Sequence, residues 1–111
     1  MSLTRLLCAV LVAAALAACG KRVPPEKAAY VGEWKAPSMY LLLLQDGSVQ
    51  YNRIKSGATT SVNGPLQGFE GHNFVVGVGL WRTTFAVSKP PYQDSGTWKM
   101  VVDGVELTRT N

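Results

Sequence analysis

Apolar and polar positions alternate over short stretches along most of the chain, and glycine or proline separates one stretch from the next. The longest piece of the second half without either residue covers positions 80–89, and it alternates instead of repeating every three to four positions. Alternation with period two is typical of strands with one buried face. The pattern therefore predicts an all-β fold, a small antiparallel up-and-down barrel or a sandwich of short strands.

The C-terminal part of this pattern predicts a hairpin with a defined register. Asp103-Gly104 tolerates the positive φ angles of a two-residue type I′ turn. Such a turn puts three cross-strand pairs on one face: Val102 with Val105, Met100 with Leu107, and Trp98 with Arg109. The last pair would allow a cation–π contact.

Asp46-Gly47 predicts a second two-residue turn, which would pair Leu44 with Val49. The opposite face of that hairpin would then carry Leu41 and Leu43, so both faces would be partly apolar. Two alternatives follow: the hairpin is covered on both sides, or Leu41 and Leu43 belong to a docking surface for lipid or a partner.

Further strands are expected at residues 59–63, 73–78 and 82–88. Two inward rows are expected on them: Phe74, Val76 and Val78 on the first, and Phe85 and Val87 on the second. Gly77 and Gly79 would permit a bulge or bend that helps the sheet close.

The N-terminus has the features of an export signal, with Arg5 followed by an apolar segment at residues 6–15. Residues 6–18 are too few to cross a bilayer as a helix, which takes about 20 residues. The tetrapeptide Leu16-Ala17-Ala18-Cys19 resembles the lipobox of bacterial lipoproteins. The alternative is an ordinary secretory signal cleaved nearby, with Cys19 as a leftover thiol.

The lipobox resemblance implies that residues 1–18 are a cleaved signal peptide and that Cys19 carries lipid on its sulfur and its freed amine. In Gram-negative lipoproteins an Asp after the lipidated Cys retains the protein in the inner membrane, and this chain has Gly20 there. The resemblance thus implies the periplasmic leaflet of the outer membrane. A Gram-positive source would place the protein on the outer face of its one membrane.

Charge and composition divide the rest of the chain into a tether and a domain. Residues 19–29 form a short, polar tether that includes Pro24-Pro25, which predicts an extended and somewhat stiff leash. Lys21, Arg22 and Lys27 supply much of the formal net charge of +4, so these cations either touch anionic headgroups or are simply solvated. The domain at residues 30–111 is near neutral, which argues against nucleic acid as a partner.

The search for catalytic chemistry is negative. Cys8 would leave with the signal, so the domain has no cysteine for a disulfide, a zinc site or a nucleophile. His72 is the one histidine and lies in a turn-like sequence, and no Gly-x-Ser-x-Gly occurs. We therefore expect no catalytic residue, no metal and no cofactor.

Gly32-Glu33-Trp34 and the late Arg109 are similar to the Gly-x-Trp motif and the late arginine of lipocalin-like barrels. That resemblance implies that Arg109 lies across Trp34. Small bacterial lipocalin-like domains of unassigned role are similar to this chain in the segment Tyr30-Val31-Gly32-Glu33-Trp34-Lys35, in the Asp46-Gly47 that follows it, and in Gly96-Thr97-Trp98-Lys99 near the end. The chain is much shorter than a full lipocalin. The alternative interpretation of Gly-x-Trp is a buried aromatic residue beside a turn.

Two functions remain open at this point. The first is a non-enzymatic binding module that engages an envelope protein, a glycan or a small apolar ligand, with Tyr92 in a predicted loop at residues 88–96 as a candidate contact. The second is an inhibitor of a wall-degrading hydrolase, because Ser56-Gly57 resembles part of the inhibitory loop of membrane-bound lysozyme inhibitors. The tyrosine and the structural cysteines of that family are missing here.

Overall fold

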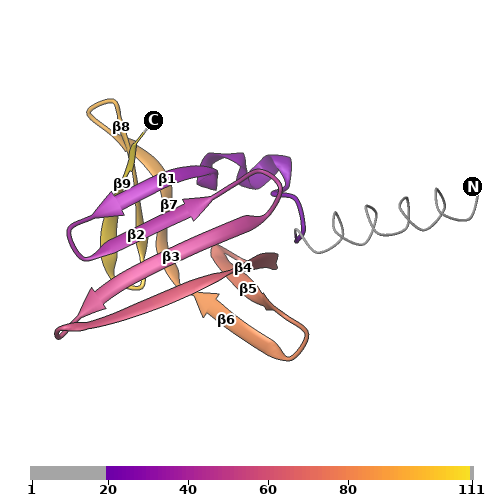
Figure 1. Cartoon of the computed structure of the whole chain (residues 1–111). Helices are drawn as coiled ribbons and strands as arrows, with labels where there is room; N and C mark the ends of the chain where they lie inside the picture. The colour runs from indigo at the N-terminus through magenta and orange to yellow at the C-terminus, as the bar shows by residue number, and fades with distance from the viewer. Residues whose placement is uncertain (1–19, 111) are drawn as a thin grey trace, which may run out of the picture.

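Nine antiparallel strands form one curled sheet, a half-barrel, in a computed structural model that describes residues 20–110 (Figure 1). The elements in chain order are η1 (Pro25–Tyr30), β1 (Gly32–Ala36), β2 (Met39–Leu43), β3 (Ser48–Lys55), β4 (Ala58–Glu70), β5 (Asn73–Val78), β6 (Trp81–Phe85), β7 (Val87–Asp94), β8 (Thr97–Val102) and β9 (Val105–Thr110). The predicted all-β class is confirmed. The predicted signal peptide and Cys19 lie outside the described residues.

The strand order is β6-β5-β4-β3-β2-β1-β9-β8-β7, so strands that follow one another in sequence pair with each other, except β6 and β7. The two edge strands, β6 and β7, meet at the corner residue Ala86. Asp103 fixes this corner, since its N–H donates to the Ala86 carbonyl at 2.8 Å and its Oδ1 accepts from the Ala86 N–H at 3.0 Å. The Val87 N–H donates to Asn73 Oδ1 at 2.8 Å and ties β7 to β5. This is the order of an up-and-down barrel that is open along one side.

The core lies on the concave face of the sheet. Its largest fully buried side chains include Trp34, Phe74, Phe85, Leu41, Leu43, Leu66, Met100 and Leu107. Phe74 and Phe85 stack with ring centres 4.9 Å apart. The inward placement of Phe74, Val76, Phe85 and Val87 is confirmed, whereas that of Val78 is wrong. Val78 is 66% exposed because it lies at the tip of the β5–β6 hairpin, beyond the core.

The predicted register of the C-terminal hairpin is confirmed. Val102 pairs with Val105 and Met100 with Leu107 across β8 and β9. The turn residues Asp103 and Gly104 have φ angles of 48° and 80°, as a type I′ turn requires.

The register predicted for the Asp46-Gly47 hairpin is wrong by one residue. The Leu44 N–H donates to the Ser48 carbonyl at 3.0 Å, so the loop has three residues and only Gly47 has a positive φ. Leu43 therefore pairs with Val49. A shift of one residue exchanges the two faces of a strand. Leu41 and Leu43 are consequently fully buried in the core and do not form a docking surface.

From residue 20 onward the predicted leash is not free of the domain but packs against it. Val23 is buried, and its N–H donates to the Gln45 carbonyl at 3.1 Å. The Lys21 N–H donates to the Leu66 carbonyl at 3.0 Å, which fixes the segment to β4. Pro24-Pro25 begins η1, because the fixed φ of proline suits the first position of a helix. The segment at residues 20–24, called the N-terminal segment below, is part of the folded domain.

The loop predicted at residues 88–96 is also a correction, because most of it belongs to β7. Pro90 and Pro91 are tolerated there because β7 is an edge strand, where a missing N–H breaks few ladder bonds. The pairing with β8 is irregular around them. The actual turn is Ser95-Gly96, with φ angles of 53° and 81°.

Candidate functional site

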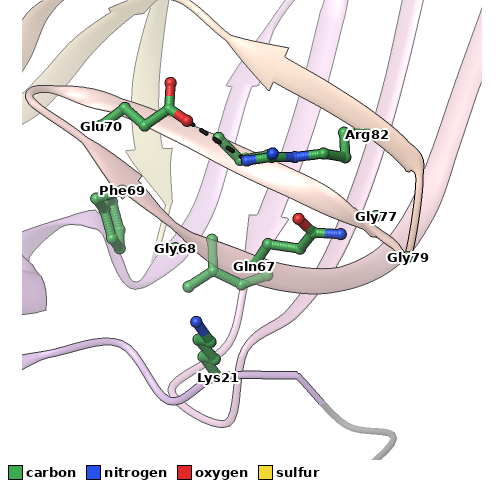
Figure 2. Close-up of a pocket in the computed structure, with 10 residues that line it drawn as sticks. Lys21, Gln67, Gly68, Phe69, Glu70, Gly77, Gly79 and Arg82 are labelled. Atoms are coloured by element: carbon green, nitrogen blue, oxygen red, sulfur yellow. Dashed lines mark hydrogen bonds and ion pairs between the residues drawn. The ribbon is translucent and has the colours of Figure 1, made fainter.

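A groove runs between the N-terminal segment and the outer face of β4, β5 and β6. It consists of two adjoining hollows of about 440 Å³ each. Figure 2 shows the first hollow, which lies between Lys21 on one side and Arg82 on the other. Four residues line both hollows: Lys21, Leu66, Gly68 and Phe69. We call the two together the N-terminal groove.

Glycines and a β-bulge shape the floor of this groove. Leu66 pairs with Val76, but Gly68 pairs with Val75, so Gln67 is an extra residue that bends β4. Gly68, Gly77 and Gly79 line the hollow with backbone alone at their positions. A Cβ on Gly77 would collide with the Trp81 carbonyl oxygen, so the close approach of β5 and β6 requires glycine.

Cations predominate on the walls of the groove. Arg82 Nη2 lies 3.4 Å from Glu70 Oε1, and both side chains are more than half exposed. The other charged residues that line the hollows are Lys21, Arg22, Lys27 and Glu26. Four cations therefore face two carboxylates. This excess favours a ligand that carries negative charge.

Lys27 is held in place at one end of the groove. Its ammonium donates to the Gly71 carbonyl at 2.9 Å and lies 5.5 Å from the ring centres of both Tyr30 and Phe69. Tyr30 in turn donates its hydroxyl to the His72 carbonyl at 2.8 Å. Burial raises the pKa of the Tyr30 phenol, so it stays a neutral donor at physiological pH. Lys27 and Tyr30 thus tie η1 to the β4–β5 turn.

Gly20 was expected to act only in sorting, but its position also requires glycine. Its φ is 87°, and a Cβ there would lie 2.8 Å from Pro65 Cβ and 2.9 Å from the Leu66 amide nitrogen. A larger residue at position 20 would push the N-terminal segment off β4. The outer-membrane sorting role itself stays a prediction.

The other predicted binding residues lie away from the groove and apart from one another. Ser56 and Gly57 form the exposed two-residue turn of the β3–β4 hairpin, at the opposite end of the sheet from residue 20 (Figure 1). Tyr92 lies on the edge strand β7, with its hydroxyl 3.5 Å from Glu106 Oε2. The structure therefore does not bring Tyr92, Ser56 and Gly57 into one site.

Tyr92 belongs to a polar cluster on the outer face of β7, β8 and β9. Lys99 Nζ lies 3.2 Å from Glu106 Oε1 and 3.5 Å from Asp94 Oδ2. The hydrogen bond to Glu106 raises the pKa of Lys99, while burial and then Glu106 raise the pKa of Tyr92. Carboxylates already surround Lys99, so this cluster favours structural pairing across the strands over ligand binding.

His72 is exposed in the β4–β5 turn. Within residues 20–110 no group of three or more His, Cys, Asp or Glu side chains is close enough to hold a metal ion. In the same part of the chain no helix is long and apolar enough to cross a membrane.

The groove was missed in the sequence because it is built by residues far apart in the chain. Lys21 reaches it only because the N-terminal segment packs on β4, and Arg82 lies on a different strand. One signal was present: glycines recur at positions 68 and 77 on the neighbouring strands β4 and β5 and at position 79 in the turn that follows, which is typical of a sheet surface approached by backbone or ligand.

No family model, curated protein or solved structure matches this chain. The resemblances to lipoproteins and to lipocalin-like domains therefore remain predictions. The structure does place the Arg109 guanidinium 5.8 Å from the centre of the Trp34 ring. The two residues pair directly across β1 and β9.

Proposed function

We propose that this chain is an outer-membrane lipoprotein facing the periplasm, whose β domain is a non-enzymatic binding module that uses the N-terminal groove. The observation that carries the proposal is the position of Lys21. It lines the groove, yet it follows the candidate lipidation residue Cys19 by only two positions. A lipid on Cys19 would therefore hold the groove at the membrane surface.

The anchoring half of the proposal rests on Leu16-Ala17-Ala18-Cys19 and on the short apolar run before it. Two acyl chains suffice for stable membrane anchoring, so the protein would need no membrane-spanning helix. Gly20 in place of Asp supports the outer membrane over the inner membrane.

The binding half rests on the chemistry of the groove. Its floor is glycine backbone, its walls carry Lys21, Arg22, Lys27 and Arg82, and Phe69 supplies an apolar surface. Such a site suits an envelope component with an anionic group and an apolar or sugar part. Its residues offer positioning and charge complementarity, which is what a binding module requires.

Mass spectrometry of the mature N-terminus tests the anchor. We expect an acylated cysteine at position 19, and Cys19→Ser should release the protein from the membrane fraction. An unmodified N-terminus that starts elsewhere would refute the anchor.

Titration of the mature protein with glycerol 3-phosphate and with a muramic acid-containing peptidoglycan fragment tests the groove. We expect amide chemical shifts to move at residues 67–70 and 82, and Arg82→Gln should weaken binding several-fold. Lys55→Gln, at the far end of the sheet, is the matched control. Shifts confined to other surfaces, or equal effects of the two variants, would refute the groove as the site.

A second function, inhibition of a wall-degrading hydrolase, is favoured by the exposure of Ser56-Gly57. This turn projects from the end of the sheet opposite residue 20, so an anchored protein would present it away from the membrane (Figure 1). A lysozyme activity assay with the mature protein tests this inhibitory function. Inhibition that Ser56→Trp abolishes would support this function, and full lysozyme activity at micromolar protein would exclude it.

A further inference from the structure

Large apolar side chains are exposed mainly at one end of the domain. Among the described residues the exposed large hydrophobic side chains are Leu44, Ile54, Val78, Leu80 and Trp81. Three of them surround the tight turn of the β5–β6 hairpin, and Leu80 is fully exposed. Trp81 is half exposed, with the other side of its ring resting over Gly64. Exposure of such a projecting apolar tip to water does not stabilise the domain.

The tip lies beside the start of the described chain. Lys21 and Gly79, the central residue of the tip, line the same hollow of the N-terminal groove. Figure 1 shows the first described residues, the β2–β3 turn and the β5–β6 turn at one end of the sheet. Leu44 belongs to this β2–β3 turn, whose Gly47 packs against Lys21. Only Ile54 of the exposed apolar residues lies at the opposite end.

The chain leaves almost no spacer between this end and the candidate lipid. Gly20 is the one residue between Cys19 and Lys21, and the Lys21 N–H is bonded to β4. One extended residue spans only about 3.5 Å. A lipid on Cys19 would therefore bring the end of the sheet that carries Leu80 to the headgroups and hold it there.

Cations lie beside the apolar tip. Lys21 and Arg82 line the adjoining hollow, and Arg22 lies next to Lys21 in the chain. Tryptophan and leucine beside lysine and arginine are the combination that settles at a membrane interface, with rings at headgroup level and cations on anionic phosphates.

From these observations we infer that the β5–β6 tip is a membrane-docking element: Val78, Leu80 and Trp81 enter the headgroup–acyl boundary of an anionic bilayer while Lys21, Arg22 and Arg82 contact its phosphates. The inference rests on the proposed lipid anchor. It adds a fixed orientation, in which the N-terminal groove opens at the membrane surface and the β3–β4 hairpin points away.

An environment-sensitive fluorophore tests this orientation. The mature chain has no cysteine other than Cys19, so Leu80→Cys and Ile54→Cys each give a single free thiol for labelling. Both positions are exposed and apolar, and they lie at opposite ends of the sheet. The labelled, lipidated proteins are reconstituted into vesicles of phosphatidylethanolamine and phosphatidylglycerol, with and without brominated acyl chains.

We expect the probe at position 80 to shift to shorter wavelength, to brighten several-fold and to be quenched by brominated lipid, and the probe at position 54 to show none of these changes. Lys21→Gln with Arg22→Gln should reduce the response at position 80. Circular dichroism of each variant verifies the fold, and wild-type protein supplies a second readout through quenching that Trp81→Phe removes.

Protein that floats with the vesicles but gives equal spectra at positions 80 and 54 would overturn the docking inference and leave the anchor intact. A response at position 80 that follows protein concentration instead of lipid would identify a contact with a second copy and would also overturn it. A mature chain without lipid on Cys19 would overturn the proposed anchor, and the docking inference with it.

Discussion

The Arg109 guanidinium carbon lies 5.0 Å from the centre of the Trp98 ring, at the position that the Asp103-Gly104 turn predicts. The same guanidinium lies near the Trp34 ring, and its Nη1 donates to the Ala29 carbonyl at 3.4 Å. Gly32 makes room for this arrangement, because a Cβ there would lie 2.9 Å from Arg109 Cδ. One arginine thus joins β1, β8 and the end of η1.

Replacement of Arg109 tests this joint. Arg109→Met removes two cation–π contacts while keeping much of the side-chain volume, so we expect a loss of about 1–2 kcal/mol in the free energy of unfolding. The stability of Arg109→Lys should lie between that of wild type and that of Arg109→Met, because lysine keeps the charge but not the planar group. Urea denaturation gives the measurement, with Lys55→Met as a control that should change stability by less than about 0.5 kcal/mol. Equal stability of the Met variant and wild type would show that the contact contributes nothing.

The two faces of the C-terminal hairpin should respond differently to truncation. Met100 is fully buried, so Met100→Ala should cost about 2–5 kcal/mol. Lys99 lies on the opposite face, in ion pairs with the mostly exposed carboxylates of Asp94 and Glu106, so Lys99→Ala should cost at most about 1 kcal/mol. Urea denaturation of both variants compares them directly. A loss for Lys99→Ala as large as that for Met100→Ala would contradict the observed register.

The two Asp-Gly turns show how far local sequence determines register. In Asp103-Gly104 both residues take positive φ, and the predicted pairs are correct. In Asp46-Gly47 only Gly47 does, and Asp46 Oδ1 instead accepts the Ser48 N–H at 2.9 Å. The same dipeptide therefore closes a two-residue or a three-residue loop. The burial of one face of β2 decides which loop forms. Because both faces of β2 are partly apolar in the sequence, the pattern does not reveal which face is buried.

The N-terminal segment and the groove depended on contacts that no local pattern encodes. Val23 is a single apolar residue in a polar stretch, and it becomes buried because Gln45 satisfies its backbone on both sides. Pro24-Pro25 favours an extended leash, but the same two residues suit a segment that packs against the domain. The position of Lys21 in the groove follows from that packing.

Gly77 and Gly57 separate backbone strain from steric collision. Both have positive φ, at 152° and 78°, but a Cβ on Gly57 would meet nothing within 4 Å, whereas one on Gly77 would meet the backbone of Trp81. We expect Gly57→Ala to cost roughly 1 kcal/mol through strain alone. Gly77→Ala should cost roughly 2–4 kcal/mol, because β5 and β6 must also separate. Thermal unfolding monitored by circular dichroism compares the two. A Gly77→Ala variant no less stable than Gly57→Ala would contradict the close approach of the two strands.

Glu33 should make the stability of the domain sensitive to acid. Its Oε1 accepts the Thr110 hydroxyl at 2.6 Å, its Oε2 accepts the Tyr40 hydroxyl at 2.8 Å, and Lys35 Nζ lies 3.5 Å away. The hydrogen bond from Thr110, then that from Tyr40, lowers the pKa of Glu33 below its usual value of about 4.3. The carboxylate form therefore stabilises the fold above that value, and the contribution disappears as pH falls through the lower pKa of the folded state.

Glu33→Gln should accordingly be less stable than wild type near neutral pH, and the difference should shrink below about pH 4. Tyr40→Phe removes one of the two hydroxyl donors and should give part of the same change, which separates the hydrogen bonds from the Lys35 charge. Urea midpoints measured between pH 3 and pH 7 supply the comparison. Parallel pH profiles for wild type and Glu33→Gln would show that the carboxylate has the same pKa in the folded and unfolded chains. The hydrogen bond from Thr110 on β9 to Glu33 on β1 would then not depend on the charge of Glu33.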